Sequence, residues 1–253
     1  MQIFSRISLL ATALLFAVSI TYAADLKHLT DSERAALRGE IRDYLLENPD
    51  IIVEVIAILE QRRKQAEAEA ELSLISDSYD DIFNDGYSYV GNNPEGDITI
   101  VEFLDYRCAY CKRAHADVQA LLEEDRNIRY IVKEFPILGP ESVLASKAAI
   151  SLYIGQGSTA YEAFNDALMR FNGPINESSL AAMARKLGLD DAAMLAGIDD
   201  DEVARRIAGT RDLGIRLRVN GTPTFIIGSD FYRGFLTLEQ MRDAVKSVRL
   251  ARK

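Results

Sequence analysis

Cysteine and histidine are scarce in this chain of 253 residues, which has two of each. A closed structural zinc site normally takes four ligands, and only Cys108, Cys111, His28 and His115 are available, so such a site is not expected. The sequence also lacks a G-x-S-x-G motif, a glycine-rich phosphate loop and a histidine-rich cluster. Hydrolase and nucleotide-binding functions are therefore without support.

Positive charge is also in the minority. Lysine and arginine total 29 against 39 acidic residues, which gives a formal net charge of −10. Because an acidic surface repels phosphate backbones and anionic lipids, nucleic acid is not an expected partner. After residue 23, no apolar run is long enough to span a bilayer.

The first residues have the pattern of a leader. Arg6 precedes an apolar run from Ile7 to Ile20, and the small residues Ala23-Ala24 follow. This pattern predicts a signal peptide over residues 1–23 rather than a membrane anchor, because the run is short and no stop-transfer pattern follows. Removal of the leader changes the net charge from −10 to −11 and places the protein outside the cytoplasm, where disulfides form.

Two helices are predicted after the leader. Thr30-Asp31-Ser32-Glu33 has the pattern of a capping box, and Asn48-Pro49 should end the first helix and cap the second. The second helix carries an apolar stripe at helical spacing, formed by Ile52, Val55, Ile56 and Leu59. Either the chain's own domain or other copies of the chain must cover this stripe, and we favour self-association.

A turn-rich boundary separates this arm from the rest of the chain. We expect the arm and its linker to occupy residues 24–75 and a second domain to occupy residues 76–253. In that domain the sequence predicts an α/β fold, with a helical insertion at about 140–213. The expected strands are 98–104, 128–135, 224–227 and 231–235, and the other expected helices run from 111 to about 124 and from Thr237 onward.

The cysteines occur together as Cys108-Ala109-Tyr110-Cys111, directly after the strand predicted over 98–104. A C-x-x-C that opens a helix is the arrangement of a redox dithiol, because the helix N-terminus stabilises a thiolate on the first cysteine. The second cysteine can then attack a mixed disulfide and release the substrate. Half of a zinc site or a small structural disulfide are the alternatives.

A second motif, Gly221-Thr222-Pro223, directly precedes the strand at 224–227. Proline is unusual at this position because it donates no hydrogen bond to a sheet. A cis Thr222–Pro223 bond would explain it. Alone, the motif indicates a plain turn; beside a C-x-x-C it is much more specific.

Together these motifs resemble the DsbA family of periplasmic thiol-disulfide oxidoreductases, which have a thioredoxin fold with a helical insertion. Glu102, six residues before Cys108, matches an acidic residue that this family buries beside its second cysteine, and Lys133 resembles a family lysine near that acid. The N-terminal helical arm is similar to the oligomerising segment of ScsC (suppressor of copper sensitivity C) proteins. The chain is thus identified as a member of the DsbA family, and the resemblance implies a periplasmic protein.

The resemblance also implies roles for the site residues. Cys108 would be the exposed nucleophile and Cys111 the buried resolving thiol. Thr222 and cis-Pro223 would face the cysteines, offer backbone to a client peptide and exclude metal. Glu102 would relay a proton for Cys111. A buried carboxylate that Lys133 satisfies is the other interpretation, and the two are compatible.

Two features near the cysteines affect the expected redox strength. Many family oxidants have histidine between the cysteines, whereas Ala109-Tyr110 carries no charge, so a less stabilised thiolate and a less oxidising pair are expected. His115 lies one turn after Cys111 and could tune it, although a solvated histidine is the favoured interpretation.

The preferred function is an oligomeric protein disulfide isomerase or reductase that acts on secreted, cysteine-containing proteins. It would need no cofactor, and a membrane partner would keep its dithiol reduced. One alternative is a DsbA-like oxidase that donates its disulfide. Another is a copper-tolerance protein that binds Cu(I) through Cys108 and Cys111, since soft thiolates suit that ion.

Overall fold

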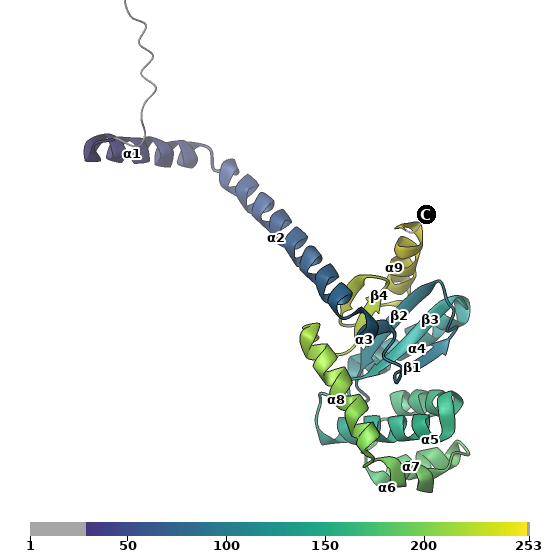
Figure 1. The fold of residues 1–253 in the computed structure, drawn as a ribbon. Helices are drawn as coiled ribbons and strands as arrows, with labels where there is room; N and C mark the ends of the chain where they lie inside the picture. Colours follow the sequence, from purple (N-terminus) through teal and green to yellow (C-terminus); the bar gives the residue numbers. More distant parts are fainter. Residues whose placement is uncertain (1–28, 252–253) are drawn as a thin grey trace, which may run out of the picture. The chain divides into compact units, whose positions relative to one another are not determined.

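A computed structural model describes residues 29–251 of the chain (Figure 1). The signal peptide predicted over residues 1–23 lies outside these described residues. The chain divides into two compact units between Arg63 and Lys64, within one long helix. None of the described helices is both long and apolar enough to cross a membrane.

The first unit contains helix α1 (Asp31–Glu47) and the beginning of α2 (Asp50–Asp77). The predicted capping box is present: Thr30 N donates to Glu33 Oε2 at 2.8 Å, and Glu33 N donates to Thr30 Oγ1 at 3.3 Å. The prediction for Asn48 was wrong in one respect. Its backbone and side-chain N–H groups both donate to Tyr44 O at 2.9 Å, so Asn48 caps the end of α1 instead of the start of α2.

The second unit is built on a five-stranded sheet with the order β1-β3-β2-β4-β5. The central strands β2 and β3 are parallel, and the other neighbours are antiparallel. The strands are β1 (Tyr89–Asn92), β2 (Ile98–Leu104), β3 (Ile128–Glu134), β4 (Thr224–Ile227) and β5 (Asp230–Arg233). Both faces of β2 and β3 are largely buried, as expected for strands that helices cover on both sides.

Helices cover both faces of this sheet (Figure 1). One core packs β2 and β3 against α4, α5 and α9, and the other packs them against α3, α8 and the end of α2. The helices are α3 (Tyr79–Phe83), α4 (Ala109–Glu124), α5 (Pro140–Arg170), α6 (Glu177–Lys186), α7 (Asp191–Gly197), α8 (Asp201–Arg216) and α9 (Leu238–Ala251). The helices α5 to α8 form the insertion between β3 and β4 that the sequence predicted.

Two local features of this unit were not predicted. Strand β1 was not predicted, because its four residues include Gly91 and end in Asn92, which has φ of 58°. The boundary after the arm was expected to be rich in turns, but helix α3 begins there at Tyr79.

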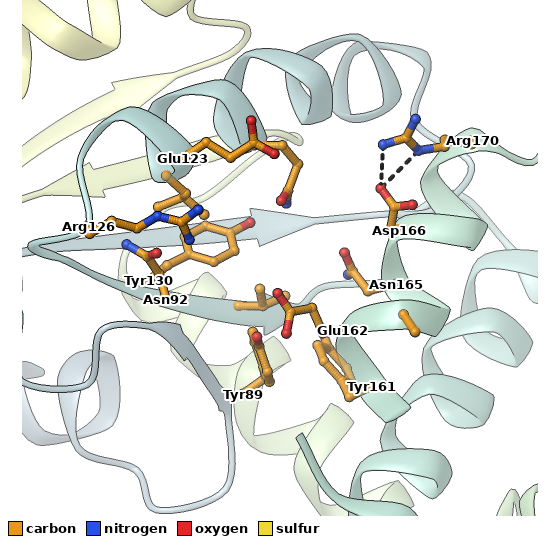
Figure 2. Close-up of a pocket in the computed structure, with 14 residues that line it drawn as sticks. Tyr89, Asn92, Glu123, Arg126, Tyr130, Tyr161, Glu162, Asn165, Asp166 and Arg170 are labelled. Carbon is orange, nitrogen blue, oxygen red and sulfur yellow. Dashed lines mark hydrogen bonds and ion pairs between the residues drawn. The ribbon is translucent and has the colours of Figure 1, made fainter. Parts of the chain in front are cut away.

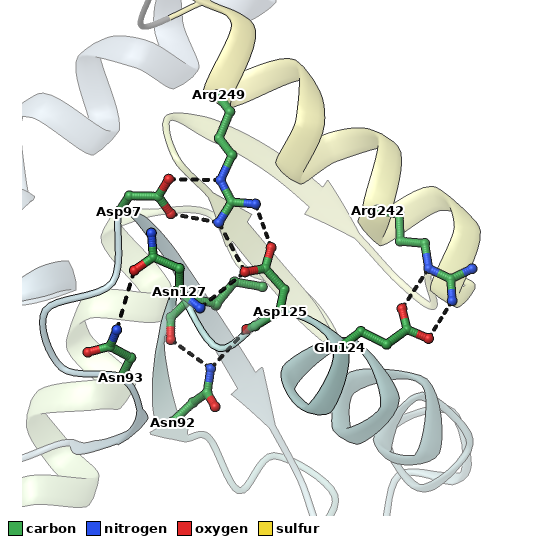
Figure 3. Close-up of polar contacts among 9 residues, drawn as sticks. Asn92, Asn93, Asp97, Glu124, Asp125, Asn127, Arg242 and Arg249 are labelled. Carbon is green, nitrogen blue, oxygen red and sulfur yellow. Dashed lines mark hydrogen bonds and ion pairs between the residues drawn. The ribbon is translucent and has the colours of Figure 1, made fainter.

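Polar contacts fix the loops at one end of the sheet (Figure 3). Arg249 of α9 reaches both Asp97, just before β2, and Asp125, just after α4, with its Nε 2.8 Å from Asp97 Oδ2. Asn92 Nδ2 donates to Ile128 O at 2.9 Å. The Arg249 contacts hold the entry to β2, the strand that leads to the cysteines, and the exit of α4, the helix that contains Cys111.

Candidate active site

The cysteines lie where β2 gives way to α4. After Leu104 the chain makes a short turn in which Cys108 N donates to Asp105 O at 3.0 Å. Cys108 is the N-cap of α4, and Cys111 lies in the helix's first turn. Both are thiols, Cys108 with 7% of its surface exposed and Cys111 with none. The expectation of an exposed Cys108 is therefore corrected, since the residue is buried.

Strand pairing places the Gly221-Thr222-Pro223 motif beside the cysteines. Strand β4 runs antiparallel to β2 with Thr224 opposite Phe103, so the residues before β4 lie beside the end of β2. The Thr222–Pro223 bond is cis, as predicted. Cys108 Sγ lies 3.1 Å from Thr222 O, to which it donates a hydrogen bond when it is protonated.

The two sulfurs have opposite electrostatic environments. A hydrogen bond from the Cys111 thiol is the largest cause that lowers the pKa of Cys108 to about 5, and contacts with Thr222 and with the backbone of Cys111 and Tyr110 add to it against the effect of burial. Burial raises the pKa of Cys111 far above its usual range, helped by that same hydrogen bond and by the charge of Glu102. At neutral pH the pair is therefore one thiolate and one thiol.

The prediction drawn from Ala109-Tyr110, a Cys108 thiolate less stabilised than in the family oxidants that have histidine there, stays a prediction. The uncharged dipeptide supplies no side-chain charge to Cys108. The hydrogen bonds that lower its pKa come instead from the second cysteine, from Thr222 and from the first turn of α4. A sequence comparison that considers only the two intervening residues misses these donors.

Glu102 lies on the face of the sheet that α4 and Cys111 cover. Its charge raises the pKa of Cys111, and only 2% of the residue is exposed. Burial raises the pKa of Glu102 to about 7; a hydrogen bond donated by the Tyr130 hydroxyl opposes this, and the charge of Cys108 adds to it. A carboxyl group with a pKa near 7 can both accept and return a proton under physiological conditions.

Lys133 lies away from these residues, so the interpretation that it satisfies Glu102 is wrong. In the parallel register Glu102 pairs with Val132, whereas Lys133 pairs with Phe103, and successive side chains point to opposite faces. Lys133 Nζ contacts Asp85 Oδ2 at 2.6 Å and Asp81 O at 2.7 Å on the other face. The pleat of β3 thus separates Lys133 from the cysteines.

His115 is buried, which corrects the interpretation of a solvated histidine. Its Nε2 lies 2.9 Å from Asp166 Oδ1 on α5, and burial lowers the pKa of its imidazole despite that carboxylate. The residue therefore ties the active-site helix to the insertion.

Two residues of the site were missed. Tyr130 was not singled out, although its alternation with Ile128 and Val132 in β3 places it on the face of Glu102. Asp105 is fully buried; its Oδ1 accepts from Arg107 N at 2.7 Å and its Oδ2 from Ile137 N at 2.8 Å. It shapes the turn before the cysteines, and no local sequence pattern marks it.

Within residues 29–251, no group of three or more histidine, cysteine or acidic side chains is placed to hold a metal ion. The copper alternative, in which Cys108 and Cys111 bind Cu(I), stays a prediction.

Comparison with known families gives two matches. Residues 99–246 match the DSBA-like thioredoxin domain, and residues 33–66 match the N-terminal domain of the copper resistance protein ScsC. The first matched segment contains the dithiol, and the second lies within the helical arm.

Solved structures resemble the chain over most of their own length. A thioredoxin-like oxidoreductase from Silicibacter pomeroyi DSS-3 is 41% identical, with a TM-score of 0.64 over 68% of this chain and 97% of that chain. The thiol-disulfide exchange protein alpha-DsbA2 from Wolbachia pipientis is 30% identical, with a TM-score of 0.68 over 72% and 98%. A linker-deletion mutant of Proteus mirabilis ScsC is 23% identical, with a TM-score of 0.67 over 89% and 99%.

These likenesses confirm the predicted thioredoxin fold with its N-terminal helices. The chain spans less than a quarter of the length of the curated relatives that it matches, which are Na⁺/H⁺ antiporters of Salinispora and Herminiimonas species.

Proposed function

This chain belongs to the family of DSBA-like thioredoxin domains, and from that premise we propose that it is a periplasmic protein disulfide isomerase and reductase. The observation that carries the proposal is the asymmetry of the two sulfurs, a Cys108 thiolate beside a neutral, buried Cys111. A thiolate is the attacking species in disulfide exchange, and a protected thiol can wait to resolve the product.

The reaction proceeds in two exchanges. The Cys108 thiolate attacks a client disulfide, a bond forms between Cys108 and one client sulfur, and the other client sulfur leaves as a thiolate. For reduction, Cys111 gives its proton to Glu102 and attacks Cys108, which releases the second client thiolate and leaves a Cys108–Cys111 disulfide. For isomerisation, a different client thiolate attacks instead and regenerates Cys108.

Thr222 and Pro223 position the client in this scheme. The Thr222 carbonyl lies 3.1 Å from Cys108 Sγ, so an extended client segment beside Pro223 would have its sulfur close to the nucleophile. Because backbone groups can pair with a client of any sequence, this arrangement suits an enzyme that accepts many different proteins.

The helical arm supports the choice of isomerase. Its large apolar side chains are 42–67% exposed between Ile52 and Leu59, a surface suited to contact between copies of the chain. We expect residues 24–75 to assemble the protein into a homo-oligomer whose several dithiols can hold one misfolded client. A membrane protein of the same compartment would reduce the dithiol after each reductive cycle.

A DsbA-like oxidase is the second candidate, and the low pKa of Cys108 favours it. A stabilised thiolate is a good leaving group, so the disulfide form of such a pair gives up its oxidising equivalents readily.

The test compares the mature chain with an arm variant, Ile56→Glu with Leu59→Glu, and with Gln61→Glu as a matched control on the same helix. We expect the double variant to be monomeric in light scattering and to lose reactivation of scrambled ribonuclease A, while the control retains both. Undiminished reactivation by a monomeric variant would contradict the role of the arm. Rapid oxidation of a reduced peptide with no reactivation in any form would establish the oxidase instead.

A further inference from the structure

A tyrosine-lined pocket lies beside the catalytic helix and has no part in the exchange scheme. It measures about 510 Å³ and is bordered by β1, β3, α4 and α5. We call it the tyrosine pocket, since the rings of Tyr89, Tyr130 and Tyr161 lie along its walls (Figure 2). Charged side chains, among them Glu123, Arg126 and Glu162, also line it, so the pocket is a polar environment.

Tyr130 connects this pocket to the active site. Its side chain is part of the pocket wall, and its hydroxyl donates a hydrogen bond to Glu102 Oε2. Glu102 itself does not line the pocket and is only 2% exposed. The Tyr130 phenol therefore both lines the pocket and contacts the buried carboxyl group.

The exchange scheme needs such a connection because Cys111 has no exposed surface. When Cys111 attacks the mixed disulfide, its proton passes to Glu102, and the client then covers the Cys108 side of the site. Glu102 must lose that proton before the next cycle, and it needs a route that the client does not block.

We propose that Tyr130 is a positioning and proton-relay residue for Glu102, and that the tyrosine pocket is the port through which the proton reaches solvent. This rests on the proposed function of the dithiol. In the relay, the protonated Glu102 donates its proton to the Tyr130 oxygen while the Tyr130 hydroxyl proton passes to water in the pocket. Tyr130 stays neutral throughout, and the same steps in reverse return a proton to Cys111.

The same pocket offers a matched control. Tyr161 also lines it, but its hydroxyl donates to Glu134 Oε1 at 2.6 Å, a second buried carboxyl that Tyr106 and Ser146 also contact. Tyr161→Phe removes one phenol hydroxyl from the pocket without touching the contact to Glu102. Tyr130→Phe removes the equivalent atom and breaks that contact.

The experiment follows a disulfide-bonded peptide in single turnovers from pH 5 to pH 9, with the full mature chain. Formation and resolution of the mixed disulfide are timed separately. We expect Tyr130→Phe to slow resolution by about tenfold or more, in keeping with the loss of one proton-transfer group, and to move the midpoint of its pH profile upward. Formation of the mixed disulfide should keep its rate. Tyr161→Phe should leave resolution and its pH profile unchanged.

A second variant, Gln119→Trp, fills the pocket while leaving the Tyr130 hydroxyl in place, and it should also slow resolution. Equal effects of Tyr130→Phe and Tyr161→Phe would overturn the relay, because they would indicate a general disturbance of the pocket. An unchanged pH profile in Tyr130→Phe, or unchanged resolution in Gln119→Trp if Tyr130→Phe fails to fold, would overturn it as well. Failure of the unmodified protein to form any mixed disulfide would contradict the proposed function itself.

Discussion

At the scale of single residues, the reactivity of Cys108 depends on its partner sulfur. The Cys111 thiol is the largest cause of the low pKa of Cys108, so the donor rather than the bulk of residue 111 matters. An isolated C-x-x-C gives the spacing that makes this possible, but not the direction in which the hydrogen bond runs.

We predict that Cys111→Ala raises the pKa of Cys108 from about 5 by removing this donor. Cys111→Ser keeps a donor and should raise it less. The pH dependence of alkylation by iodoacetamide measures both values. Equal pKa values in the two variants would show that the helix terminus and Thr222 stabilise the thiolate without help from the second thiol.

Residues that belong to a motif could be predicted from the sequence, and residues that act through strand pairing could not. The paired cysteines and Gly-Thr-Pro are recognisable as motifs, and Glu102 was found because its position matches an acidic residue of the DsbA family. Tyr130 and Lys133 are three residues apart on one strand, and their roles depend on which face each takes. That assignment follows from the register of β2 and β3, which the sequence does not specify.

At the scale of elements, the strongest sequence patterns were located accurately. The expected strands 98–104 and 224–227 coincide with β2 and β4 because apolar runs between turn residues leave little choice. Strand β1 was not predicted because its stability comes from pairing with β3 at the sheet edge. Its own residues, which include Gly91 and Asn92, have low strand propensity.

Lys133 illustrates an element-level role that is structural. It holds the segment after α3 against β3 through Asp85, and both side chains are buried. We predict that Lys133→Met lowers the free energy of unfolding by about 3 kcal/mol or more, because Asp85 is left as an unpaired buried charge. Urea denaturation measures this loss. Adding Asp85→Asn should recover part of it, and the pKa of Cys108 should stay unchanged in both variants.

At the scale of the whole molecule, the α/β class and the insertion followed from the order of the elements. The helix α2 was less predictable, because its polar second half continues as a helix through the expected boundary at residue 75. Its last turn contributes Ile75 to the core of the second unit. Local composition alone does not reveal that the polar half of α2 ends in a residue that packs into the core.

The dithiol should also affect global stability in a pH-dependent way. The pKa of Cys108 is lower in the folded protein than its ordinary value of 9.0, so the folded state favours the thiolate. This contribution is complete above pH 9 and is lost as the pH falls toward 5. We predict that the melting temperature of the reduced protein, relative to Cys108→Ser, rises from pH 5 to pH 9. A constant difference across that range would contradict it.

The pleat that separates Glu102 from Lys133 also limits which mutations this protein can tolerate. Adding or deleting a single residue in β2 would rotate every following side chain to the opposite face and move Glu102 away from Cys111. A substitution in β2 changes one side chain and can have a small or a large effect. A change in the length of β2 moves every following side chain to the wrong face. In a library of single-codon insertions, β2 should therefore tolerate none.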